Sequence, residues 1–356
     1  MLHIFFSILP FLVSLWWLIR FACIYRVSDK AKRTMTWFLL TDTTLYFCHA
    51  YYFIFDFSQF FEGLWVLCSL SVYPLFYQYI CQLSSEKTFD WRKIWIFLPA
   101  FISATCIWMG AIATGQMIHK AVFSIQVLYV AISGYKKLKT YDQELLQVYA
   151  DTNKIDTRPL RKLLLCFVII SFCSAIFNIL GKQVFHDSEW LVIIPSVFYS
   201  TMIFSLCMVV FKQKFVANTL SLEMQDDSPK LPEASGGKEE INMQAMAEKI
   251  APIIQRLMEE EHFYLKQDIK ISDLAREIGT CRTYLSKYLN QELGVSFSDY
   301  INKQRIEYAK QLLREEEKTM RMDQIAFNSG FSSEVSFYRN FKKFASMTPE
   351  EWVNKK

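Results

Sequence analysis

"ISDLAREIG" (271–279) and "MDQIAFNSG" (322–330) are two short stretches of the chain that share one spacing. In each, an alanine stands four residues before a glycine: Ala275 before Gly279, and Ala326 before Gly330. A small residue on one helix lets a second helix approach closely, and glycine supplies the positive φ that a tight turn between two helices requires. Because the two copies lie 51 residues apart, the sequence predicts a repeated helix-turn-helix unit.

An amphipathic helix is expected after each glycine, with Leu285 and Leu289 buried in the first and Phe337 and Phe341 in the second. A further helix is predicted between the units over 298–314, because apolar residues recur there at helical spacing. Such a helix is roughly 25 Å long. One turn of B-DNA is about 34 Å, so a rigid connection of this length could hold two recognition helices against successive major grooves.

The outer faces of the two predicted recognition helices are polar, as base and phosphate contacts require. Arginine can bridge the two acceptors of guanine, and glutamate can accept a hydrogen bond from cytosine. Polar faces of short helices are more often merely solvated, and the region is only weakly basic, so the repeat supports the interface more strongly than the charge does. The candidate DNA-contacting residues are Arg282, Thr283, Ser286, Lys287 and Asn290 on the first helix, and Ser333, Glu334, Ser336, Arg339 and Lys342 on the second.

Residues from about 264 to 353 resemble the DNA-binding domain of the AraC/XylS family of transcription regulators. "YLSKYLNQELGVSFSDYINKQRIEYAKQLL" (284–313) resembles its first recognition helix and linker helix, and "IAFNSGFSSEVSFYRNFKKFASMTPEEW" (325–352) resembles its signature region. Ser346 departs from the pattern, since the family often has glycine there. The resemblance implies binding to double-stranded DNA and activation of transcription through contact with RNA polymerase. An attached multi-span domain is similar to that of membrane-bound family members.

The first part of the chain has the composition of a membrane domain. A membrane-spanning helix needs about 20 mostly apolar residues. Seven such runs occur, and lysine and arginine gather in alternate loops between them, while the other loops hold only Lys120 and Lys182. This bias predicts a multi-pass protein of the inner membrane, with the N-terminus outside and the C-terminal domain in the cytoplasm. The seven runs are 2–25, 37–55, 63–83, 94–114, 117–135, 163–181 and 190–211.

Asp42 and His49 lie within the second run. Ionisable groups in lipid face the bundle interior and often mark a functional site. They could sense a small ligand or protons, or they could form hydrogen bonds between helices, and the second interpretation is favoured.

The sequence thus predicts an all-α protein with four parts. These are a seven-helix transmembrane sensor or anchor (1–215), a flexible linker (216–240), an amphipathic helix (241–262) and a DNA-binding domain (263–356). The amphipathic helix could pack on the domain, as we favour, or form a homodimer seam. The scattered cysteines and histidines indicate no metal site or cofactor, and we find no catalytic motif that would indicate an enzyme. The alternative interpretation is a membrane receptor or transporter whose C-terminal domain is a regulatory or protein-interaction module.

Overall fold

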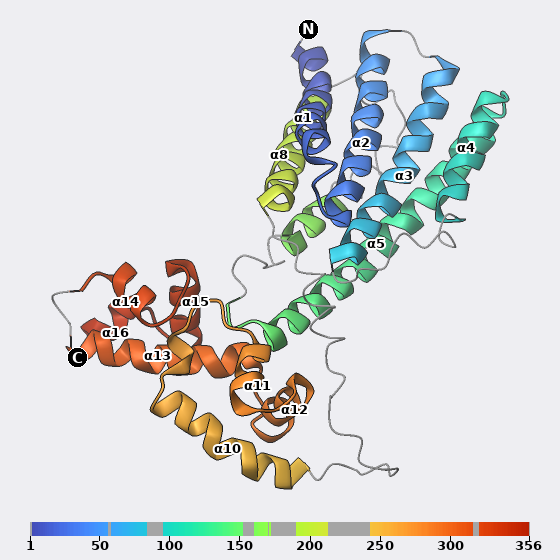
Figure 1. Ribbon diagram of the computed structural model, residues 1–356. Coiled ribbons are helices and arrows are strands. Elements are labelled where there is room, and N and C mark those ends of the chain that lie inside the picture. Colours follow the sequence, from blue (N-terminus) through green and yellow to red (C-terminus); the bar gives the residue numbers. More distant parts are fainter. Residues whose placement is uncertain are drawn as a thin grey trace, which may run out of the picture. The chain divides into compact units, whose positions relative to one another are not determined.

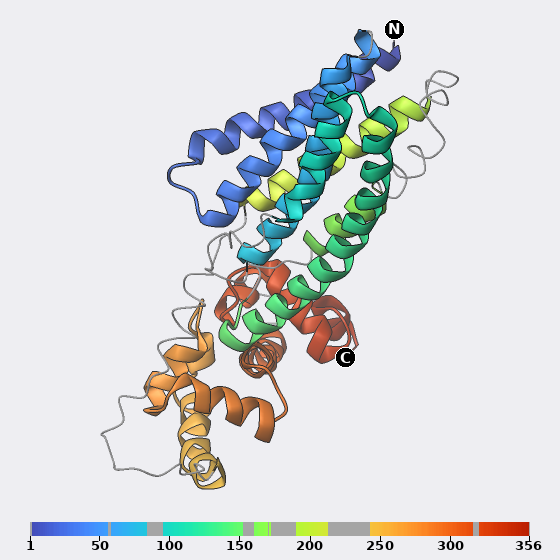
Figure 2. The same ribbon diagram turned by 90° about the vertical axis from the view of Figure 1, so that its right-hand side faces the viewer.

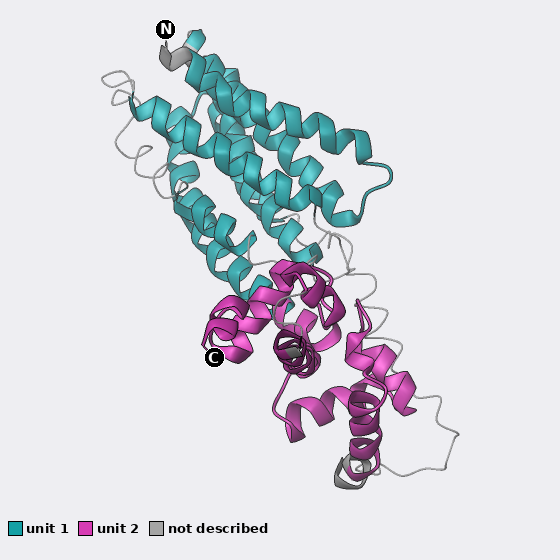
Figure 3. Ribbon diagram, turned by 90° about the vertical axis from the view of Figure 1, so that its left-hand side faces the viewer, with its two compact units in different colours: residues 1–141, 157–218 teal, residues 142–156, 219–356 magenta. Residues whose placement is uncertain are grey.

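The computed structural model describes residues 2–55, 58–83, 95–151, 160–169, 171, 190–212, 243–315 and 320–355. Every regular element in these ranges is a helix, as predicted. The chain divides into two compact units (Figure 3): unit 1 comprises residues 1–141 and 157–218, and unit 2 comprises residues 142–156 and 219–356. The predicted linker at 216–240 lies outside the described residues.

Unit 1 is a helical bundle. Its helices are α1 (Leu2–Ile24), α2 (Lys30–Ile54), α3 (Gln59–Leu83), α4 (Leu98–Trp108), the first part of α5 (Ile112–Val148) and α8 (Trp190–Lys212). α1 packs against α2, α2 against α3 and α3 against α4, and α8 returns beside α1 (Figure 1). Residues 160–169 are also helical.

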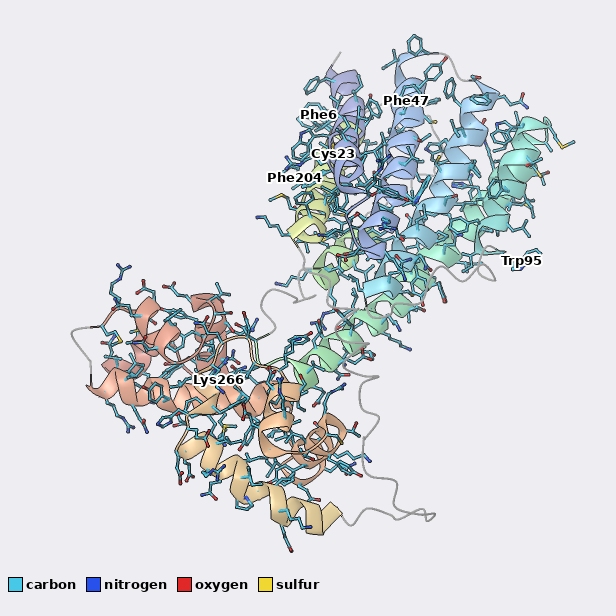
Figure 4. All side chains as sticks on the ribbon, viewed as in Figure 1. Phe6, Cys23, Phe47, Trp95, Phe204 and Lys266 are labelled. Carbon is cyan, nitrogen blue, oxygen red and sulfur yellow. The ribbon has the colours of Figure 1, made fainter. Side chains whose placement is uncertain are left out.

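The outer surface of this bundle carries many large apolar side chains. Phe47, Trp95 and Phe204 are among them (Figure 4), with exposed fractions of 43%, 69% and 42%. In water such a surface would be unfavourable, whereas in lipid it is the expected one. Four helices of the described residues are long and apolar enough to cross a membrane: Phe5–Ile24, Gln59–Leu83, Ile112–Val148 and Trp190–Lys212.

The seven predicted runs therefore have different outcomes. The run at 94–114 was wrong as a single span, because α4 ends at Trp108 and a turn at Gly110, with φ of +90°, leads into α5. At 11 residues, α4 is roughly 16 Å long, which is too short to cross a bilayer. The run at 37–55 coincides with α2 as far as Ile54, and α2 is not among the four helices that are long and apolar enough to cross a membrane. The run at 163–181 lies largely outside the described residues.

α5 continues beyond its predicted span. The sequence predicted a helix at 117–135 followed by a basic loop, but α5 runs without interruption to Val148 (Figure 2), so Lys136, Lys137 and Lys139 lie on a helix. The reason is that apolar residues recur at helical spacing among and beyond the lysines, and four of them are buried: Leu138, Tyr141, Leu145 and Val148.

Asp42 lies fully buried in unit 1 and joins three helices. Its carboxylate accepts hydrogen bonds from the Ser14 hydroxyl of α1 (2.7 Å) and the Tyr199 hydroxyl of α8 (2.5 Å). His49 is half-buried one to two turns further along α2, with its ring 6.0 Å from that of Tyr46. A buried carboxylate needs hydrogen-bond partners. These two bonds agree with the interpretation that Asp42 forms hydrogen bonds between helices.

Unit 2 contains α10 (Met243–Glu259), a 3₁₀ turn (Phe263–Leu265), α11 (Ile271–Ile278), α12 (Arg282–Lys287) with a π-helical turn after it (Tyr288–Glu292), α13 (Phe297–Glu315), α14 (Met322–Asn328), α15 (Glu334–Ala345) and α16 (Pro349–Asn354). Ile250, Ile254 and Leu257 of α10 are buried, and α10 packs against α11 and the 3₁₀ turn. This packing favours the interpretation of α10 as a packing helix rather than a homodimer seam.

Candidate nucleic-acid interface

The two repeats fold as equivalent helix-turn-helix units, as the spacing predicted. Ala275 and Ala326 are 3% and 2% exposed, and the glycines after them have φ of +73° and +83°. One backbone bond recurs in both turns: the amide of Thr280 donates to the Ala275 carbonyl at 2.9 Å, and the amide of Phe331 donates to the Ala326 carbonyl at 3.1 Å. These bonds satisfy carbonyls left open at the helix ends and fix the direction of the next helix.

The second helix of each unit buries the residues that the pattern predicted. Leu285 and Leu289 are fully buried in the first unit, and so are Phe337 and Phe341 in the second. The last two belong to a core that also contains Ile306, Ala309 and Leu313 of α13 and Ile325, Ala326 and Phe331 of the second unit. The apolar face of α15 is therefore directed into the domain, which leaves its opposite face for a ligand.

α13 connects the two units. Its 19 residues correspond to a length of roughly 28 Å, close to the predicted length. α14 and α15 both pack against it, and it also contacts the 3₁₀ turn that precedes α11 (Figure 1). Because one uninterrupted helix carries both contacts, the spacing of the two units is set by the length of a rigid element.

Arg305 ties this helix to the segment that leads into the first unit. Its side chain is fully buried, and its guanidinium donates to the carbonyl oxygens of Tyr264 and Lys266, each at 2.7 Å (Lys266 is labelled in Figure 4). It also lies 5.5 Å from the centre of the Phe331 ring. Burial lowers the pKa of Arg305 to about 10, while the carboxylates of Asp151 and Asp268 act in the opposite direction. The guanidinium therefore stays charged at neutral pH.

The predicted contact residues of the first unit lie at the outer face of α12 and the turn after it. Thr283, Lys287 and Asn290 are exposed, and Arg282 and Ser286 are half-buried. The side-chain amide of Asn290 donates to the Ser286 carbonyl at 2.8 Å and to the Gln147 side-chain oxygen at 3.0 Å.

In the second helix-turn-helix unit, Glu334 and Lys342 are exposed, and Ser333 and Arg339 are half-buried. Ser333 is the N-cap of α15, and its hydroxyl accepts a hydrogen bond from the Ser336 amide at 3.3 Å. Ser336 differs from the others because its side chain is fully buried, and its hydroxyl donates to the Asp151 carboxylate at 3.1 Å.

Three residues of the interface region were not singled out from the sequence. Val335 is 67% exposed on the first turn of α15, where its methyl groups could contact a thymine methyl. Val335 was missed because the candidate contacts were sought among polar side chains. Arg305 was missed because its partners are backbone carbonyls, and Asp151 because its partners are far away in the sequence. Among the described residues, no cluster of His, Cys, Asp or Glu could hold a metal ion.

Comparisons with known proteins give matches that cover part of the chain. A family model described as a helix-turn-helix domain matches residues 274–355. A protein named as an uncharacterized HTH-type transcriptional regulator of Staphylococcus aureus is 39% identical over 93 residues, which are 26% of this chain and 12% of that protein. A protein named as the uncharacterized HTH-type transcriptional regulator YtdP of Bacillus subtilis is 30% identical over 95 residues, which are 27% of this chain and 12% of that protein.

The chain therefore spans only a small part of the curated relatives that it matches. No solved structure matches it significantly. Together with the two repeated units and their connecting helix, the family match identifies residues 274–355 as a helix-turn-helix domain.

Proposed function

We propose that this protein is a membrane-embedded transcription regulator whose C-terminal domain binds double-stranded DNA in a sequence-specific manner. The observation that carries the proposal is the pair of helix-turn-helix units on one connecting helix. Each unit buries its apolar face and presents polar and cationic residues on the other. Two such faces on one chain suit an asymmetric DNA site that covers two major grooves.

The ten candidate residues have different roles in this proposal. Arg339, Glu334, Thr283 and Ser286 contact base edges, and Arg282, Lys287, Asn290, Ser333 and Lys342 contact bases or nearby phosphates. Ser336 contacts DNA after its hydroxyl is released from Asp151. Activation of transcription by contact with RNA polymerase follows from the family resemblance, and the signal is an unidentified small ligand or membrane stimulus.

The test of DNA binding is a site selection on the full-length chain in detergent, followed by gel-shift titration. We expect one sequence to be bound at least about a thousandfold more tightly than random DNA, with an affinity that falls as salt increases. The double variant Lys287→Ala with Arg339→Ala should lose most of this preference. Equal affinity for selected and random DNA would refute the proposal, and would favour a protein-interaction module instead.

Unit 1 embeds the protein in the membrane in this proposal. The support is its apolar outer surface, its four helices of sufficient length and the distribution of basic residues in the sequence. A reporter that is active only in the cytoplasm should work when it is fused after Lys214 and fail when it is fused after Asp187. Activity of both fusions would contradict the proposed orientation.

A further inference from the structure

The last residues of α5 and the turn after it, residues 142–151, belong to unit 2 although α5 begins in unit 1. We call them the docking segment. The rest of unit 2 forms hydrogen bonds with both the amide and the carbonyl of Ala150. The Ala150 amide donates to the Ile269 carbonyl at 3.1 Å, and the Ala150 carbonyl accepts from Ser298 (2.9 Å) and Asn302 (2.7 Å). Tyr149 and Lys270 form an isolated antiparallel bridge beside it.

The side chains of the docking segment reach both recognition elements. Gln147 accepts the hydrogen bond from Asn290, which lies just after α12. Asp151 accepts hydrogen bonds from the Ser336 hydroxyl on α15 (3.1 Å) and from the Ser332 hydroxyl in the turn before it. Asn290 and Ser336 are both among the residues that the sequence predicted to contact DNA, and one comes from each helix-turn-helix repeat.

The contact is well formed for an intrachain interface. Leu145, Val148 and Ala150 are at most 1% exposed, and on the other side Ser298, Asn302 and Ser336 are at most 4% exposed. Buried polar groups need hydrogen-bond partners. Here Ser298, Asn302 and Ser336 each donate a hydrogen bond to the docking segment, so the buried polar atoms on the two sides are paired.

We propose that the docking segment is an intrachain inhibitor of DNA binding. It occupies part of the DNA-binding surface that the two recognition elements form together. Ser336 cannot donate its single hydroxyl proton to Asp151 and to DNA at the same time. The Asp151 carboxylate also places negative charge at the start of α15, where it repels an approaching phosphate backbone. Because DNA and the docking segment exclude each other, DNA binds only the undocked fraction, and its apparent affinity is reduced by that fraction.

The same segment explains how unit 1 can control unit 2. It is the direct continuation of a helix that is long and apolar enough to span a membrane. A shift or rotation of α5 in the membrane would be carried along a rigid helix to Gln147 and would withdraw Asp151 from Ser336. This inference rests on the proposed function, because an inhibitor of DNA binding requires a domain that binds DNA.

The test uses the full-length chain in lipid nanodiscs, and combines hydrogen–deuterium exchange with DNA titration. The variant is Asp151→Ala. Its matched control is Glu144→Ala, which removes a carboxylate of the same segment that takes no part in these hydrogen bonds. We expect Asp151→Ala to bind the selected DNA about tenfold more tightly than either the wild type or the control, and to show faster exchange of the Ala150 amide.

A measurement on the wild type alone guards against a variant that fails to fold. Saturation with the selected DNA should accelerate exchange over 147–151 while the amides of α13 remain protected. The inhibitor proposal is overturned if 147–151 stays equally protected with DNA bound, or if Asp151→Ala binds DNA no more tightly than Glu144→Ala. Failure of the proposed function looks different, because then neither the wild type nor any variant prefers one DNA sequence.

Discussion

The two helix-turn-helix units share their topology but differ in how tightly they are built. A Cβ added to Gly330 would lie 2.9 Å from the carbonyl oxygens of both Tyr264 and Leu265, whereas one added to Gly279 would meet nothing within 4 Å. α15 has 12 residues and a side-chain N-cap in Ser333, whereas α12 has six residues, no side-chain cap hydrogen bond and a π-helical turn after it.

These differences suggest separate tasks for two copies of one design. The turn of the second helix-turn-helix unit packs against the segment that leads into the first helix-turn-helix unit. The core of the domain therefore fixes the geometry of this second turn. The first unit has an open turn and a short, irregular recognition helix, which leaves it more freedom to adjust to DNA. A repeat in sequence therefore need not give equal stability in the fold.

The largest expected effect separates the two turn glycines. Gly330→Ala should lower the free energy of unfolding by about 3 kcal/mol or more, since a left-handed conformation costs an alanine roughly 1–2 kcal/mol and the close carbonyls add steric strain. Gly279→Ala should cost only about 1 kcal/mol, because it meets the conformational penalty alone. Pulse proteolysis of unit 2 in urea measures both. Equal losses would show that the two turns are packed alike.

A smaller effect distinguishes base readout from phosphate contact within α15. Arg339→Ala should cost about 1–3 kcal/mol at one base pair and relax the preference there. Lys342→Ala should weaken binding to all sequences alike and reduce the salt dependence by about one unit. Site selection and salt titration with the full-length variants separate the two outcomes. If Arg339→Ala keeps the full preference in both half-sites, α15 is not the element that reads that base.

The smallest effect concerns the end of the same helix. Ser346 has φ of +61° and its amide donates to the Lys342 carbonyl at 3.0 Å, so it occupies a left-handed position at the end of α15, where glycine is the usual residue of helices. Ser346→Gly should raise the free energy of unfolding by about 0.5–1 kcal/mol, because glycine adopts this conformation without strain. The urea midpoint of unit 2 reports the change. A loss of stability would mean that the serine side chain has a stabilising contact of its own.

Local patterns in the sequence predicted the elements of the DNA-binding domain well. The alanine and glycine of each repeat, the buried leucines and phenylalanines and the connecting helix could all be predicted, because each depends on neighbours within a turn or two. Arg305 and Asp151 could not, because their partners lie far away along the chain.

The apolar half was predicted less well, for a related reason. Hydrophobicity alone does not show where a helix ends, so α4 was predicted too long and α5 too short. The lysines at 136–139 indicated a loop by their charge, although the buried Leu138, Tyr141, Leu145 and Val148 continue the helix. Because the predicted helix ended at 135, the docking segment at 142–151 was not predicted.

The most direct test of the central claim is a hydroxyl-radical footprint of the full-length protein on its selected DNA, combined with a measurement of stoichiometry. One chain should bind one asymmetric site and protect two successive major grooves on one face of the duplex, about one helical turn apart. Lys287→Ala should weaken protection of one groove and Arg339→Ala that of the other. Protection of a palindrome by two chains, or loss of the same groove in both variants, would contradict the account of one chain with two recognition helices.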